Sequence, residues 1–173
     1  KYNMSVLKHH SNWDIAPGGV TDSFGDFLGF RNIVKRGKVI RVYREKRRRI
    51  RDLASEVAEK LGLECVKVAG EVETEVEYIG TAVGGLGQIL TFADEFVDTK
   101  AEVLIFGEAL EYSTIYTLES GFPFVVTSHE ATEKPGMMKL SKLLRKKFPK
   151  VNIKYADSGV PRSFTTPKGS INA

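Results

Sequence analysis

The stretch that decides the fold is Tyr78-Ile79-Gly80-Thr81-Ala82-Val83-Gly84-Gly85-Leu86-Gly87, at residues 78–87. Residues 78–83 have the short apolar pattern of a buried strand, and the glycines that follow mark a turn. Helices are then expected at residues 88–97, 110–120 and 135–148, and strands at 102–106, 123–127 and 151–155. Strands that alternate with helices of this length are typical of a parallel sheet covered by helices. We therefore expect an α/β fold, with mainly parallel sheets and helices on both faces.

The part of the chain before residue 78 has shorter elements. Strands are expected at residues 4–9, 38–43 and 64–68, and helices at 20–30 and 45–61. The second helix would place its apolar residues on one face and end before a glycine; these residues are Ile50, Leu53, Val57, Leu61 and Gly62. We expect one α/β domain at residues 1–157, with a possible boundary of an inserted subdomain near residues 69–75. Residues 158–173 read as an irregular tail.

Composition narrows the environment of the protein. A chain of 173 residues can bury a sizeable core without a disulfide. The single cysteine, Cys65, excludes an internal disulfide framework and suits a reducing compartment. No apolar run approaches the roughly 20 residues that a membrane span needs, and the first residues do not have the pattern of a signal peptide. We therefore expect a cytoplasmic protein that does not interact with membranes.

Positive charge is concentrated between Lys35 and Arg51, where ten Lys and Arg residues stand against one acid, Glu45. Such a cluster can meet the phosphates of nucleic acid. It can equally be the solvated face of a helix, because the acids Asp52, Glu56 and Glu59 follow at once. The second interpretation is the usual origin of a charge run.

The three histidines, His9, His10 and His129, lie in two short polar segments. Each segment has an imidazole and a carboxylate four positions apart, namely His10 with Asp14 and His129 with Glu133. On a helical turn this spacing places both groups on the same side. Imidazole with carboxylate suits zinc, iron, manganese or nickel, and a bridging carboxylate can hold two such ions about 3.5–4 Å apart. The segments therefore indicate a metal site.

Three successive strand ends carry special residues: the glycine turn at residues 84–87, the pair Gly107-Glu108 and the pair Ser128-His129. In doubly wound sheets, ligands bind outside the carboxyl ends of the strands. Glycines there let the backbone approach a ligand, and the helix that follows favours an anion. Alone, the glycine turn is explained by tight packing and a single histidine by a structural role. Together, the three strand ends predict a ligand site at one edge of the sheet.

At these residues the chain resembles the Nif-three-like family, the GTP cyclohydrolase type 2 homologues. His10-Ser11-Asn12-Trp13-Asp14, followed by Pro17-Gly18-Gly19-Val20-Thr21-Asp22, is similar to a family segment that ends in His-Thr-Asn-Leu-Asp before Gly-Gly-Val-Asn-Asp. Ser128-His129-Glu130-Ala131-Thr132-Glu133 is similar to the motif Gly-His-Tyr-Ala-Thr-Glu. The glycine turn and Gly107-Glu108 also have counterparts. The departures at Trp13, Ser128 and Glu130 remove no expected ligand.

The resemblance implies a centre of two divalent metal ions (Zn, Fe, Mn or Ni) with ligands at Asp14, His129 and Glu133. It places His10 beside the metals, as a ligand or as the partner of one, and gives Glu108 a supporting or catalytic role. Family members also carry an upstream region with an adjacent His-His pair, which His9-His10 does not replace. We therefore expect that this chain corresponds to the C-terminal two-thirds of the family fold. A homo-oligomer, a hexamer, is implied as well.

Two classes of function follow. The first is a metal-dependent hydrolase acting on a nucleotide, in which Glu108 or His10 transfers a proton. The second is a non-catalytic metal-containing scaffold or regulatory protein that binds proteins or nucleic acid, the latter through the segment from Lys35 to Arg51. The residues do not decide between these classes, because a fold analogy does not establish chemistry.

Overall fold

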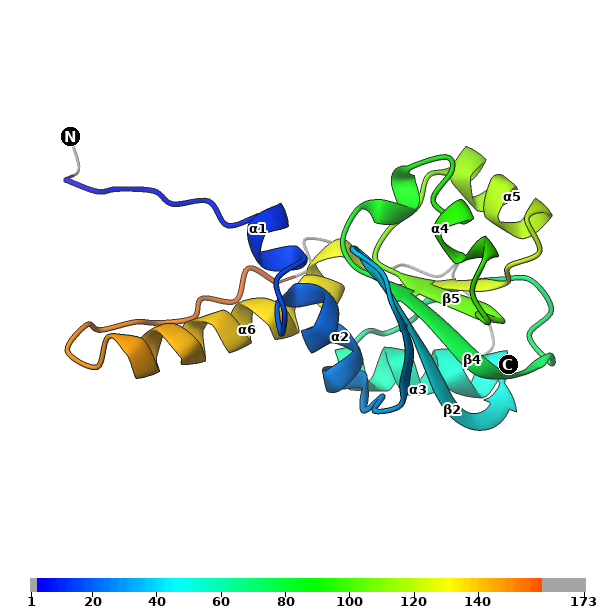
Figure 1. Ribbon diagram of the computed structural model, residues 1–173, viewed down its shortest axis with the longest axis horizontal. Coiled ribbons are helices and arrows are strands. Elements are labelled where there is room, and N and C mark those ends of the chain that lie inside the picture. Colours follow the sequence, from blue (N-terminus) through cyan, green and yellow to red (C-terminus); the bar gives the residue numbers. More distant parts are fainter. Residues whose placement is uncertain (1–2, 160–173) are drawn as a thin grey trace, which may run out of the picture.

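A computed structural model describes residues 3–159, and its centre is a single six-stranded sheet (Figure 1). The strands are β1 (Ile33–Arg36), β2 (Ile40–Arg49), β3 (Lys67–Ala69), β4 (Glu75–Ala82), β5 (Val103–Phe106) and β6 (Phe124–Val126), in the order β1-β2-β4-β5-β6-β3. The strands β4, β5 and β6 run parallel to one another, as predicted. The pairs β1–β2, β2–β4 and β3–β6 are antiparallel. The expectation of a mainly parallel sheet is therefore only partly right, since the basic segment forms a hairpin at one edge.

Helices cover both faces of the sheet, as predicted. They are α1 (Ser11–Asp14), α2 (Val20–Leu28), α3 (Ile50–Leu61), α4 (Asp94–Val97), α5 (Glu111–Glu119) and α6 (His129–Lys147), with a 3-10 helix, η1, at Leu86–Gln88. On one face, α2 and α3 bury Phe24 and Leu53 against Ile79 and Ile105 of the sheet. On the other face, where Figure 1 shows α4 and α5, a cluster of aromatic rings packs on Leu104. Burial of these two apolar layers holds the fold together.

The basic segment is a strand and not a helix. The expected helix at residues 45–61 begins only at Ile50, because residues 45–49 continue β2. There Arg48 and Arg49 are register partners of Val76 and Glu75 in β4. Pairing with β4 satisfies the backbone of this charged segment, and the helical pattern starts where the apolar residues do. The helical-face interpretation of the segment from Lys35 to Arg51 is therefore wrong.

Two further elements differ from expectation. The helix expected at residues 88–97 is reduced to η1 and the four-residue α4, since the loop between them turns Phe92 inward against Phe96 with ring centroids 5.4 Å apart. The last helix begins at His129 and not near residue 135. Ser128 caps it by accepting a hydrogen bond from the backbone N–H of Ala131 at 3.0 Å, and Pro135 lies inside it.

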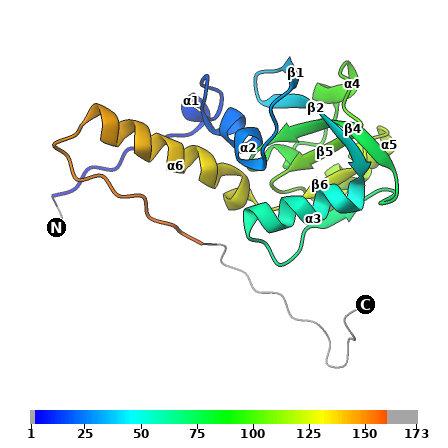
Figure 2. The ribbon, with the colours of Figure 1, turned by 90° about the horizontal axis from the view of Figure 1, so that it is seen from below.

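The strands expected at residues 4–9 and 151–155 are not formed. Residues 3–9 run as an extended segment, and residues 148–159 return alongside α6, which projects from the body of the molecule (Figures 1 and 2). The returning segment is held by Arg145, whose Nε donates to the carbonyl of Ile153 at 2.8 Å, and by an ion pair of 2.5 Å between Lys134 and Asp157. Strand-like composition does not make a strand where the backbone has no partner strand.

The predicted subdomain boundary falls in the turn from β3 to β4 and stays a prediction. Of the predicted tail, residues 160–173 lie outside the described part of the chain. Among residues 3–159, the structure contains no helix with the length and apolar character that crossing a bilayer requires.

Candidate functional site

The carboxyl ends of β4, β5 and β6 meet at one edge of the sheet, where the sequence placed a ligand site. The backbone N–H of Glu108, after β5, donates to the carbonyl of Gly84, after β4, at 3.2 Å. The N–H of Gly84 donates in turn to Oγ1 of Thr132 on α6 at 2.9 Å. Thr132 is fully buried. These bonds fix the backbone that carries Glu108 and His129.

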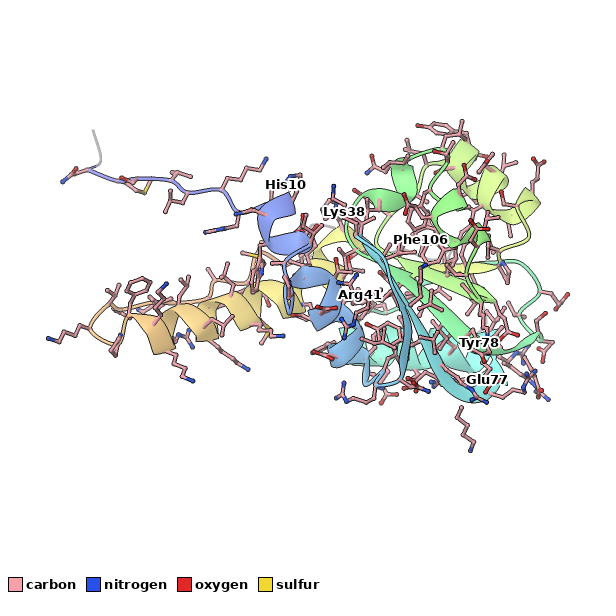
Figure 3. The ribbon with its side chains drawn as sticks, viewed as in Figure 1. His10, Lys38, Arg41, Glu77, Tyr78 and Phe106 are labelled. Carbon is pink, nitrogen blue, oxygen red and sulfur yellow. The ribbon has the colours of Figure 1, made fainter. Side chains whose placement is uncertain are left out.

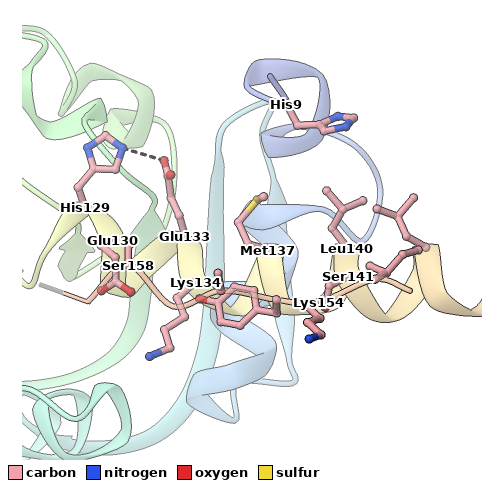
Figure 4. Close-up of a pocket in the computed structure, with 14 residues that line it drawn as sticks. His9, His129, Glu130, Glu133, Lys134, Met137, Leu140, Ser141, Lys154 and Ser158 are labelled. Carbon is pink, nitrogen blue, oxygen red and sulfur yellow. Dashed lines mark ion pairs between the residues drawn. The ribbon is translucent and has the colours of Figure 1, made fainter. Parts of the chain in front are cut away.

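His129 is the first residue of α6, and its ring stands between two carboxylates. Its Nδ1 lies 2.7 Å from Oε1 of Glu108, and its Nε2 lies 2.9 Å from Oε1 of Glu133. Figure 4 shows the second of these contacts. Glu133 follows one helical turn later, so the predicted spacing does place both groups on one side of the helix. Glu108 holds the opposite edge of the ring.

Gly84 makes room for this pair. Its φ of +60° lies in the left-handed region, and a Cβ there would come within 2.3 Å of Oε1 of Glu133 and 2.9 Å of Nε2 of His129. Only glycine meets both demands. The glycine turn therefore has a specific purpose, which is to let the backbone pass directly against the two side chains.

His10 and Asp14 lie at the two ends of the short helix α1. The backbone N–H of Asp14 donates to the carbonyl of His10 at 3.0 Å, and Oγ1 of Thr21 donates to the carbonyl of Asp14 at 2.7 Å. Together with His129 and Glu133, His10 and Asp14 line a pocket of about 300 Å³. The structure thus brings four of the five predicted site residues to one pocket, with Glu108 behind His129.

The charges of the site favour a cation. Burial raises the pKa of Glu133, and the negative charge of Asp14 raises it further, although His129 opposes this. Burial alone would lower the pKa of His129, but its hydrogen bond to Glu108 and the charge of Glu133 raise it overall. The raised pKa of His129 thus reflects the two carboxylates beside it, whereas burial is the largest cause of the raised pKa of Glu133.

The donor groups fit a metal ion in part. Two ligands at about 2.1 Å from one ion are about 3.0 Å apart at the right angles of octahedral coordination and about 3.4 Å apart at the tetrahedral angle of zinc sites. Nε2 of His129 and Oε1 of Glu133 lie 2.9 Å apart, which is close to the octahedral value and is also the length of the direct hydrogen bond between them. Within residues 3–159, however, no three His, Cys, Asp or Glu side chains are arranged so as to hold one ion. His129 and Glu133 thus form the two-residue nucleus of the predicted site, and Asp14 and His10 line its pocket without completing a metal site.

Comparison with known proteins shows the family to which the chain belongs. Residues 1–160 match the sequence model of Duf34/NIF3 (NGG1p interacting factor 3). The chain belongs to the Duf34/NIF3 family. A Clostridium perfringens protein named GTP cyclohydrolase 1 type 2 homolog is 24% identical over 162 residues, which are 86% of this chain and 59% of that protein. This NIF3-family chain therefore spans well under two thirds of that relative.

Solved structures agree on the fold. The Staphylococcus aureus hypothetical protein SA1388 has a TM-score of 0.75 at 16% identity, and the match covers 90% of this chain and 67% of that one. A Bacillus cereus protein related to NIF3 has a TM-score of 0.73 at 13% identity, with 91% and 72% covered. Both confirm the α/β architecture of this NIF3-family chain.

A second cavity, of about 590 Å³, lies between α6 and the returning segment. His129 and Glu133 stand at one end of it, and Met137 and Leu140 lie further along the helix (Figure 4). His129 and Glu133, two of the three predicted ligands, thus belong to the walls of both cavities. In this NIF3-family chain, a ligand could therefore approach His129 and Glu133 from either cavity.

The basic segment is largely neutralised by acids. Arg41, whose side chain is 5% exposed, pairs with Asp22 at 2.6 Å, and Arg44 pairs with Glu77 at 2.6 Å near one end of β4 (Figure 3). Seven of the ten cations have such partners: Arg36, Arg41, Arg44, Arg47, Arg48, Arg49 and Arg51. Nucleic-acid binding by this part of the NIF3-family chain stays a prediction.

Sequence reasoning missed one residue beside the site. Nε2 of Gln88 donates to Oε1 of Glu108 at 2.5 Å. We expected Gln88 at the start of a regular helix, where nothing marks it as a neighbour of Glu108. Its place directly after the glycine turn was the only available signal.

Proposed function

We propose that this chain binds divalent metal ions at the edge of the sheet through Asp14, His129 and Glu133, with His10 beside them. We propose further that it is the metal-binding part of a hydrolase. The observation that supports this best is the 2.9 Å separation of His129 Nε2 from Glu133 Oε1 in a pocket that His10 and Asp14 also line. A centre of two ions, as the family resemblance implies, requires ligands beyond this nucleus.

The electrostatics support the same proposal. Asp14 and Glu133 are two carboxylates whose charges disfavour each other, and burial of Glu133 adds to the cost. A divalent cation would remove both penalties, because an opposite charge stabilises the ionised form of each carboxylate. The alternative, protonation of Glu133, needs a lower pH.

The roles of the side chains follow from their positions. A bound divalent ion would supply an activated water at neutral pH and polarise the substrate. Glu108, on Nδ1 of His129, keeps the ring oriented so that Nε2 faces Glu133. His10, an exposed residue that lines the pocket, would exchange a proton with a leaving group.

The proposed class of substrate comes from the name of a relative. The Clostridium perfringens protein is named as a homolog of a GTP cyclohydrolase. A purine nucleotide is therefore the first substrate to test, with turnover measured by chromatography before chelation, after chelation and after metal is restored. The proposal predicts turnover that chelation abolishes and metal restores, and that His129→Ala lacks throughout. Turnover that survives complete chelation would contradict it.

A second candidate is a non-catalytic scaffold or regulatory protein. The family description names an interacting factor and not a reaction. In that case metal would bind without turnover, and any nucleic-acid affinity through Lys35 to Arg51 would fall steeply with added salt. The proposed homo-hexamer is compatible with both candidates and is checked by light scattering of the chain with and without metal.

A further inference from the structure

We propose that Gln88 is a positioning residue for the site: it fixes the Glu108 carboxylate, which in turn fixes the ring of His129. The inference rests on the proposed metal site, because its benefit is to present Nε2 of His129 as a ligand. Gln88 itself does not contact the pocket that His10 and Asp14 line.

One carboxylate oxygen makes both contacts. Oε1 of Glu108 accepts from Nε2 of Gln88 at 2.5 Å and lies 2.7 Å from Nδ1 of His129. With one donor, a carboxylate that is 29% exposed can rotate and exchange its oxygens. With two donors on the same oxygen, its orientation is set, because rotation would break both bonds.

The main chain that carries Gln88 is held rigidly, although the side chain is exposed. The N–H of Gln88 donates to the carbonyl of Gly85 at 3.0 Å, and the buried hydroxyl of Ser113 donates to the carbonyl of Gly87 at 2.6 Å. A Cβ on Gly87 would come within 2.5 Å of the carbonyl oxygen of Glu108. The turn therefore packs directly on the backbone of Glu108, and this contact brings the amide of Gln88 to its carboxylate.

A neutral donor suits this task. When the Nδ1–H of a neutral imidazole donates a hydrogen bond to a carboxylate, Nε2 keeps a free lone pair and can bind metal. A Lys or Arg at position 88 would fix Glu108 but also neutralise it, and so weaken its hold on Nδ1. The amide of Gln88 orients Glu108 and leaves its charge to His129.

The first test reads the Gln88 contact directly. Gln88 is the only glutamine in the chain, so 15N labelling of glutamine amides gives one side-chain signal. We expect that signal to shift strongly in Glu108→Ala and to be unchanged in Glu111→Ala, an exposed acid nearby on α5. Equal spectra for wild type and Glu108→Ala would overturn the proposal.

The second test reads its effect on His129. Ring 15N shifts, recorded without metal at an alkaline pH where imidazole is neutral, should show a larger share of the Nδ1-protonated tautomer in the wild type than in Gln88→Leu, because Glu108 favours this tautomer while Glu133 beside Nε2 favours the other. We expect Gln88→Leu to shift the tautomer toward protonated Nε2 and to weaken zinc binding about tenfold. Gln88→Glu, which keeps the shape, should be more severe, because it places a second negative charge against Glu108. Ile89→Ala, at an exposed neighbour, is the control.

The outcomes separate the two proposals. If Gln88 served only to fill space, Gln88→Glu would behave as wild type and Gln88→Leu would be the harmful change, which would overturn the inference. If His129→Ala abolishes zinc binding while both Gln88 variants keep the wild-type tautomer and affinity, the inference is wrong and the metal site stands. If His129→Ala binds zinc as well as wild type, the proposed function fails, and the tautomer shift alone decides the role of Gln88.

Discussion

Nε2 of His129 and Oε1 of Glu133 lie 2.9 Å apart, one turn apart on α6, and the main chain of Gly84 passes directly beside them. The pair is held from three sides, by Glu108 on the ring, by Gly84 on the carboxylate and by the capped start of the helix at Ser128. The first predictions concern the contacts that keep this arrangement.

Gly84→Ala should impair zinc binding severely, because its Cβ would overlap Oε1 of Glu133. It should also cost about 1–3 kcal/mol in the free energy of unfolding through the positive φ alone. Gly62→Ala is a matched control, since Gly62 has a φ of +67° but nothing within 4 Å of its Cβ. Urea unfolding and zinc titration of both variants check this. Zinc affinity that falls equally in the two variants would contradict the overlap.

Thr132→Val should destabilise the fold by about 1–3 kcal/mol, because the buried N–H of Gly84 loses its acceptor. Thr132→Ser keeps the hydroxyl and should restore most of this loss. Thermal unfolding of the two variants gives the comparison. If Val were no more harmful than Ser, which keeps the hydroxyl and loses only the methyl, the hydrogen bond to Gly84 would not account for the loss.

Asp22→Asn should cost about 3 kcal/mol in the free energy of unfolding, since it leaves the nearly buried guanidinium of Arg41 without its counter-charge. Asp26→Asn removes an acid that is 60% exposed and pairs with Arg31 at 3.7 Å, so it should change stability little. Denaturant unfolding at pH 7 measures both. Equal losses would show that the ion pair of Asp22 is no stronger than a surface pair.

The same carboxylate makes stability depend on pH. Burial alone would raise the pKa of Asp22, but its bonds to Arg41 and to the N–H of Gly18 hold that pKa below the usual 3.8. A lowered pKa in the folded state means that the stabilisation is complete above about pH 4 and is lost as pH falls through the folded value. Urea unfolding at pH 5 and pH 3 should show a smaller loss in Asp22→Asn than in wild type. An equal loss would assign the pH dependence to other groups.

The sequence predicted well those elements whose own residues carry a clear strand or helix pattern. The strands near residues 102–106 and 123–127 and the helix near residues 110–120 lie within a residue or two of their predicted places. The prediction of a helix at residues 45–49 was wrong, because pairing with β4 overrides the helical pattern of this charged segment. Residues 4–9 and 151–155 have the composition of strands, but no partner strand lies beside them among residues 3–159.

The site, too, contains some relationships that the sequence predicted and others that it could not predict. The relation of His129 to Glu133 is local, so the four-residue spacing predicted it. The convergence of Gly84, Glu108 and His129 followed from parallel strands whose carboxyl ends share an edge. The contact of Gln88 with Glu108 depends on how the glycine turn packs, and the pairing of Arg41 with Asp22 depends on two elements meeting across the sheet. Neither leaves a signature at a fixed spacing in the sequence.

The central claim is that Asp14 and Glu133, with His129, bind metal. Elemental analysis of the purified chain tests it most directly, in wild type, in the double variant Asp14→Asn/Glu133→Gln and in the control Asp26→Asn/Glu111→Gln, which removes two exposed acids that line neither of the two cavities. We predict bound divalent metal in wild type and in the control, and loss of it in the double variant. Metal retained in the double variant at the wild-type level, or absent from wild type after growth and purification with added zinc, would contradict the claim.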